Sequence, residues 1–150
     1  VNNEYSSTIT LIPISQLKTT SSTAAADIKA YLTQIDGLRP QELADGQAIA
    51  TAIQSAATGN VQPLSQARVR IAQFSAALKG VSTPKPAQEY QQLYVSLIDF
   101  TVQQLQAIEQ NATGDQAKAA QAVLNIQNTL PSYVTRLSSL RATVEGASNQ

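Results

Sequence analysis

Two short stretches that resemble each other decide the fold. Residues 53–60 are IQSAATGN and residues 108–115 are IEQNATGD, and the two stretches lie 55 residues apart. In each, Ala-Thr-Gly ends a segment with helical patterning, and Asn60 or Asp115 opens the next. Glycine readily adopts the left-handed conformation that closes a helix, and an Asn or Asp side chain caps the helix that follows. Each stretch therefore predicts the turn of an antiparallel helical hairpin.

Helical patterning extends from these turns over most of the chain, because apolar residues recur at every third or fourth position. Ser15 is the candidate N-cap of the first helix, Gly37 is expected to end it, and Pro40 suits the first turn of the second. Pro131 predicts a kink near residues 127–130, because proline removes one backbone hydrogen bond and clashes one turn back. The expected helices are residues 15–36, 40–58, 61–80, 87–112 and 115–145.

These elements predict a single all-α domain over residues 15–146, an antiparallel four- to five-helix bundle built from two helical hairpins plus an N-terminal helix. The helix at 87–112 is apolar on two sides, so we expect it at the centre. We interpret the hairpins as a duplication. The alternative is that favourable helix–turn–helix chemistry arose twice in Ala- and Gln-rich sequence. Residues 147–150 are expected to be disordered.

The bundle is preceded by an extended N-terminal arm, residues 1–14. Its second part, YSSTITLIPI at residues 5–14, is rich in β-branched side chains and partly alternating, which favours an extended chain. A single strand does not stabilise itself. The arm is therefore expected to pack across the bundle, to add to the edge of a partner, or to serve as a tether.

The composition excludes most catalytic and metal chemistry. The chain has no Cys, His, Met or Trp. Disulfides, the usual zinc sites, haem ligation and Ser-His-Asp or Cys-His catalysis all need residues that are missing. The ten carboxylates are scattered, without the spacing of a calcium-binding loop. We expect no metal, no cofactor and no enzymatic activity; an enzyme that uses carboxylates alone is the remaining catalytic alternative.

Charge and hydropathy limit the classes of partner and the cellular locations that the sequence allows. Ten Lys and Arg residues balance ten Asp and Glu residues, so we expect no binding to nucleic acid. No apolar run approaches the roughly 20 residues that span a bilayer, so no transmembrane segment is expected. The chain starts at Val1, which suggests a processed form or an excised fragment. Together with the low charge and the missing Cys and Met, this favours an exported bacterial protein, periplasmic or at the cell surface.

Four residues are candidates for a ligand site or a polar core: Asp99, Arg68, Tyr94 and Tyr90. Asp99 lies on the second apolar edge of its helix and needs a partner if it is buried. Its candidate partners are Arg68, Arg70, Arg136 and Arg141. Tyr90 and Tyr94 are one helical turn apart. Such tyrosines are mostly core residues whose hydroxyls reach water, but the pair also suits an aromatic or sugar ligand.

The second hairpin, residues 83–140, carries a recognisable pattern. A proline-led helix precedes a Gly-Asp turn and a second long helix. The residues that carry it are Pro84, Pro86, Glu89, Tyr90, Leu93, Leu97, Thr113, Gly114 and Asp115. In this pattern the hairpin resembles helical-bundle domains of exported bacterial lipoproteins and cell-surface proteins of unknown function. Many of those carry a lipid-bearing Cys just upstream, and such an anchor would need chain before Val1. The resemblance implies a location and a fold, and no activity.

The sequence thus favours an exported, non-enzymatic helical domain for binding or scaffolding, with an unidentified protein partner or self-association. Gln-rich, weakly charged helix faces suit such contacts. One alternative is an extracytoplasmic sensor-type bundle that binds a small ligand between helices. Another is a subunit of an extracellular filament or coat, in which the arm pairs with a neighbouring subunit.

Overall fold

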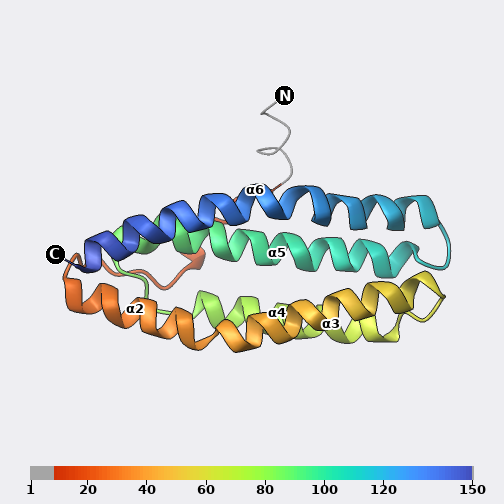
Figure 1. Ribbon diagram of the computed structural model, residues 1–150, viewed down its shortest axis with the longest axis horizontal. Coiled ribbons are helices and arrows are strands. Elements are labelled where there is room, and N and C mark those ends of the chain that lie inside the picture. The colour runs from red at the N-terminus through yellow and green to blue at the C-terminus, as the bar shows by residue number, and fades with distance from the viewer. Residues whose placement is uncertain (1–8, 150) are drawn as a thin grey trace, which may run out of the picture.

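The structure, a computed structural model, describes residues 9–149 and is an all-α bundle (Figure 1). Its elements are η1 Ile14–Gln16, α2 Ala25–Gly37, α3 Arg39–Ala57, α4 Gln62–Lys79, η2 Lys85–Ala87, α5 Gln88–Asn111 and α6 Gln116–Ser148. Within the described range, the one β-type pairing is an isolated parallel bridge between Thr19 and Thr83. The fold class predicted from the sequence is confirmed.

The first two α-helices lie end to end along one side of the bundle (Figure 1). Leu38 joins them in a helical conformation, with φ −88° and ψ −10°. Gly37 ends α2 as expected, but the chain does not turn back there. Pro40 lies in the first turn of α3, where its missing amide proton leaves no carbonyl unpaired. The bundle therefore has four rows, which are α2 with α3, then α4, α5 and α6.

The two repeated stretches form turns at the same end of the bundle (Figure 1). One joins α3 to α4 and the other joins α5 to α6, so both predicted hairpins are present. Gly59 has a φ of +95°, the left-handed conformation expected of a helix-closing glycine. Gly114 is not left-handed, contrary to the prediction, and the residue that ends α5, Ala112, is right-handed, with φ −60° and ψ −33°. Asp115 caps α6 by accepting the Lys118 amide at 3.1 Å.

The N-terminal helix begins at Ala25 instead of Ser15. The segment before it pairs with the loop that precedes α5. The Thr20 amide donates to the Thr83 carbonyl at 2.9 Å, and the Thr83 amide donates to the Lys18 carbonyl at 2.8 Å. These non-local bonds satisfy backbone groups in a stretch whose β-branched residues have low helix propensity, so the helix starts after it.

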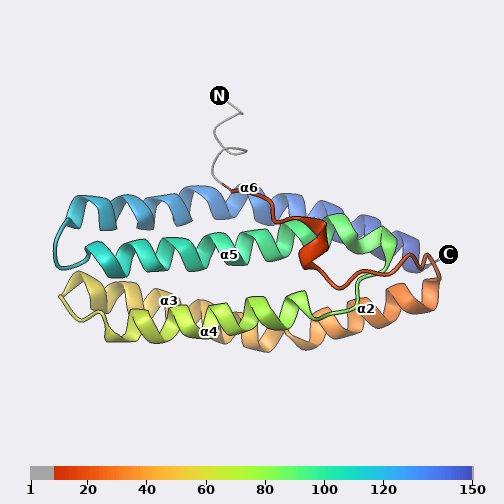
Figure 2. The ribbon, with the colours of Figure 1, turned by 180° about the vertical axis from the view of Figure 1, so that it is seen from behind.

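The described part of the N-terminal arm packs on α5 (Figure 2). Ile9 is buried in a small apolar cluster with Leu93, Leu97, Phe100 and Tyr133. The Ile12 amide donates to Ser96 Oγ at 2.9 Å, and Gln92 Nε2 donates to the Ile12 carbonyl at 2.8 Å. Of the three expected roles, the described residues show packing across the bundle; residues 1–8 lie outside the described range.

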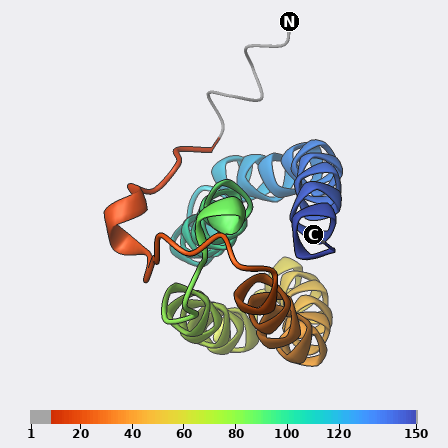
Figure 3. The same ribbon diagram turned by 90° about the vertical axis from the view of Figure 1, so that its left-hand side faces the viewer.

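α5 has more buried residues than any other helix of the described range, in line with its two apolar sides, and almost every residue from Tyr90 to Thr101 is buried. It does not lie at the centre, because the bundle has four rows and α5 packs on α4 and α6. α6 continues without interruption through Pro131 and bends about its middle (Figures 1 and 3). It ends at Ser148, which is buried, so the expected end at 145 and the expected disorder of residues 147–149 are wrong. Gln150 lies outside the described range.

Candidate functional site: a groove between α3 and α6

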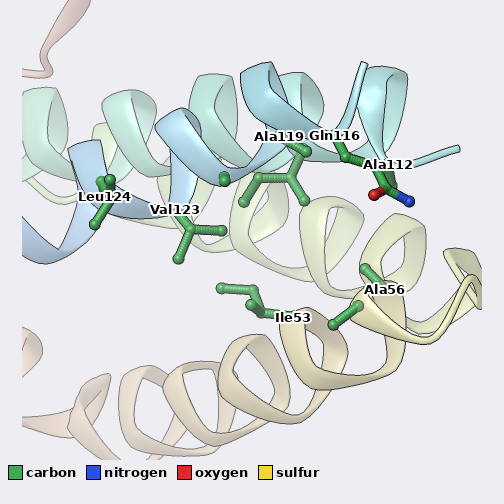
Figure 4. Close-up of a pocket in the computed structure, with 10 residues that line it drawn as sticks. Ile53, Ala56, Ala112, Gln116, Ala119, Val123 and Leu124 are labelled. Carbon is green, nitrogen blue, oxygen red and sulfur yellow. The ribbon is translucent and has the colours of Figure 1, made fainter. Parts of the chain in front are cut away.

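A groove separates α3 from α6. The closely packed helix pairs are α5 with α6, α3 with α4, α4 with α5, and α2 with α6. The first cavity in the groove has a volume of about 660 Å³ and lies beside residues 35–50 and 130–141. The second, of about 520 Å³, lies between the end of α3 and the start of α6 (Figure 4). We call the two together the α3–α6 groove. Its apolar walls are Leu43, Ile49 and Ile53 on α3 and Val123, Leu124 and Val134 on α6.

Large apolar side chains are exposed on both walls of this groove. Leu43 is 57% exposed, Val134 52% and Leu124 46%. In the second cavity, Ile53 points from α3 toward Val123 on α6 (Figure 4). Among the described residues, three of the five exposed large apolar side chains line the groove. Single exposed apolar residues are ordinary, but their clustering in one groove makes this groove the candidate site.

Charged groups gather at one end of the groove, where α2 meets α6. Arg141 donates from both Nη atoms to the two carboxylate oxygens of Asp36, at 2.9 and 3.0 Å, and from Nε to Glu145 at 3.0 Å. The hydrogen bonds from Arg141 hold the pKa of Asp36 below its usual range. Because one guanidinium is shared by two carboxylates, this triad keeps one net negative charge.

Two tyrosines of α5 lie at the same end of the groove. The Tyr90 and Tyr94 rings meet edge to face with their centroids 5.8 Å apart. The Tyr94 hydroxyl donates to the Glu42 carboxylate, and burial followed by this bond raises the pKa of Tyr94. Arg39 also lines the groove and lies close enough to help lower the pKa of Asp36. Within residues 9–149, neither Arg39 nor Glu42 has an ion-pair partner.

Two of the four predicted site residues, Tyr90 and Tyr94, meet in this groove. Asp99 lies outside it and faces α4, where Lys79 Nζ is 3.2 Å from Oδ2 and Ser75 Oγ donates to Oδ1. The predicted arginine partners of Asp99 are therefore wrong, and its partner is a lysine. Lys79 is the last residue of α4, where its long side chain reaches across to α5. Asp99 is half-buried and paired, as part of the contact between α4 and α5.

Arg68 is likewise outside the groove, because its Nε donates to Glu109 at 2.8 Å and links α4 to α5. The sequence reasoning missed the charged end of the groove. A signal existed for Arg141, because it occupies a position of the apolar stripe of α6 and a cation there requires a carboxylate partner. Nothing local marks Arg39 and Glu42, which are charged residues in the exposed first turn of a helix.

Two buried polar clusters elsewhere hold helices together. The Asp45 side chain is fully buried and pairs with Arg70 at 3.0 Å, which joins α3 to α4. Gln91 is also fully buried. It accepts the Tyr31 hydroxyl at 2.5 Å and donates to the Leu78 carbonyl at 2.7 Å, which joins α2, α5 and α4. Neither cluster lines the groove, and both have a structural role.

Comparisons of the chain with known protein families, curated proteins and solved structures gave no match. Among residues 9–149, no helix has the length and apolar character to cross a membrane. The same residues hold no group of three acidic side chains placed to bind a metal ion. The α3–α6 groove combines apolar walls with two phenol groups and a few charges, which is the usual make-up of a small-molecule binding site.

Proposed function

We propose that this chain is a non-enzymatic helical binding domain and that the α3–α6 groove is its binding surface. The observation that carries the proposal is the exposure of Leu43, Leu124 and Val134 on the facing walls of one groove. Apolar surface in water costs about 25 cal/mol per Å², so a ligand that covers these side chains gains free energy. The first cavity, about 660 Å³, has the size typical of ligand sites.

The proposed location is outside the cytoplasm, in a bacterial cell envelope. Support comes from the sequence, which lacks Cys and Met, is 13% charged, and resembles exported lipoprotein domains in its second hairpin. A sensor-type bundle that binds a small ligand is the second candidate, and the tyrosines and charges beside the first cavity favour it. The filament alternative has less support, because Ile9 and Ile12 pack on the chain's own α5.

The test is a titration with N-phenyl-1-naphthylamine, an uncharged dye whose fluorescence rises in apolar surroundings. We expect saturable binding to the wild type and loss of binding in Val134→Glu, which places a charge in the groove. The matched control is Val69→Glu, because Val69 is similarly exposed, at 45%, but lies on α4 outside the groove. Absence of binding to the wild type, or equal binding by the two variants, overturns the proposal.

A further inference from the structure

The groove has a polar end and an apolar end. Its four charged lining residues, Asp36, Arg39, Glu42 and Arg141, all belong to the first cavity. The lining of the second cavity is apolar except for Gln116. A docked amphipathic helix binds by apolar anchors at every third or fourth residue along its groove, which gives a cluster of charges at one end no role. Charges at one end only fit a different occupant, which is a molecule with one polar head and one apolar chain.

The charged residues at the polar end of the groove indicate which head group a ligand carries. Arg39 is a cation without an anionic partner, and Glu42 is an anion without a cationic partner, within the part of the chain that the structure describes. The triad of Asp36, Arg141 and Glu145 adds one net negative charge. A complementary head carries both signs and includes an ammonium. The Tyr90 and Tyr94 rings at the same place also attract an ammonium group.

We propose that the α3–α6 groove binds a single-chain amphiphile with a zwitterionic phosphate–ammonium head, the chemistry of a lysophospholipid. The phosphate lies at Arg39, the ammonium lies at Glu42 and Asp36, and the chain runs past Leu43 toward Ile53. From Glu42 to Ile53, α3 rises about 16 Å, roughly the length of an extended twelve-carbon chain. This inference rests on the proposed function, because it names the ligand of the same groove.

The test is displacement of bound N-phenyl-1-naphthylamine by four twelve-carbon amphiphiles that differ only in the head. They are dodecylphosphocholine, dodecyltrimethylammonium, dodecyl maltoside and dodecanoate, each below its critical micelle concentration. We expect dodecylphosphocholine to displace the dye at the lowest concentration, the cation next, the uncharged maltoside third, and the anion last. The excess negative charge at the polar end sets the order of the last three.

Two variants test the binding of the head group separately from the binding of the apolar tail. Arg39→Gln should lower the affinity for dodecylphosphocholine by about fivefold, which corresponds to the loss of one exposed ion pair. The affinity for dodecyl maltoside should stay unchanged. Glu42→Gln should lower the affinity for dodecyltrimethylammonium by a similar factor. Arg136→Gln is the matched control, because Arg136 lies over the Tyr133 ring and outside the groove.

The outcomes distinguish this inference from the proposed function. Equal displacement by all four amphiphiles, or an Arg39→Gln variant that binds dodecylphosphocholine as tightly as the wild type does, overturns the head-group assignment and leaves the groove as an apolar binding surface. If none of the four amphiphiles displaces the dye, the proposal that the groove binds an amphiphile is overturned. A wild-type protein that binds no dye overturns both proposals together.

Discussion

Replacing Gly46 by leucine is expected to stabilise the fold and to block the α3–α6 groove at the same time. Gly46 lies inside α3, lines the first cavity, and does not have a positive φ. A Cβ atom added there meets nothing within 4 Å. Interior glycine costs a helix about 0.8–1.0 kcal/mol relative to alanine, and leucine is nearly as good as alanine. Gly46→Ala and Gly46→Leu should each raise the free energy of unfolding by about 0.5–1 kcal/mol, and Tm by about 1–4 °C.

The two substitutions should differ in binding. Alanine adds one methyl group, so Gly46→Ala should bind N-phenyl-1-naphthylamine almost as the wild type does. Leucine projects a branched side chain into a cavity of about 660 Å³, one helical turn from Leu43. Gly46→Leu should therefore weaken dye binding by about tenfold, a loss of about 1.4 kcal/mol. The measurements are thermal unfolding by circular dichroism and dye titration on the same samples.

A matched control exists on α6. Gly146 is a helical glycine with open space around it, and it lies outside the groove, so Gly146→Leu should leave dye binding unchanged. A lower Tm for Gly46→Leu would show that the α3 backbone or the space beside Gly46 does not accept a side chain. Unchanged dye affinity in a stably folded Gly46→Leu would refute the groove as the binding surface.

Three further predictions concern the polar contacts of the bundle. Arg70→Met leaves the buried Asp45 carboxylate without a cation and should lower the free energy of unfolding, measured in urea, by about 2 kcal/mol. The loss is smaller than for a fully buried ion pair because Arg70 is half exposed. Asp36→Asn should cost under about 1 kcal/mol at pH 7. Because Arg141 lowers the folded-state pKa of Asp36, the stabilisation is present above the unfolded pKa, and the difference from wild type should shrink as pH falls below about 4. Tyr31→Phe leaves a buried amide oxygen unpaired and should cost about 1–2 kcal/mol at pH 7. Burial raises the pKa of Tyr31, so wild type loses stability as pH rises above about 10 and the deficit of the variant should shrink there.

Local signals made most of the fold predictable. Both Ala-Thr-Gly stretches form the predicted turns, and Asp115 caps α6 as the sequence indicates. Gly114 is not left-handed, and the N-cap of α4 is Val61 instead of Asn60.

The start of the first helix was not predictable, because it depends on hydrogen bonds of Lys18 and Thr20 with Thr83, which is far away in the chain. The end-to-end arrangement of α2 and α3 was also not predicted, since Gly37 indicated only where α2 ends, and the direction of α3 depends on Leu38, which stays helical.

The candidate site was predictable only in part. Tyr90 and Tyr94 were singled out by their spacing on one helix, and both line the groove. The charged end depends on which helices fail to pack together. That follows from the spatial arrangement of α3 and α6, so no local pattern marked Arg39 or Glu42. Asp99 was a candidate because its neighbours are apolar, but its partner is Lys79 at the end of another helix.

The binding surface is tested most directly by an NMR titration of methyl-labelled protein with N-phenyl-1-naphthylamine. We expect saturable shifts at the methyl groups of Leu43, Leu124 and Val134, which line the α3–α6 groove. Leu11 and Val69 are also exposed and lie outside the groove, so their methyl signals should stay in place. Shifts confined to Leu11 and Val69, or equal shifts at all five residues, would contradict the claim that the groove is the binding surface.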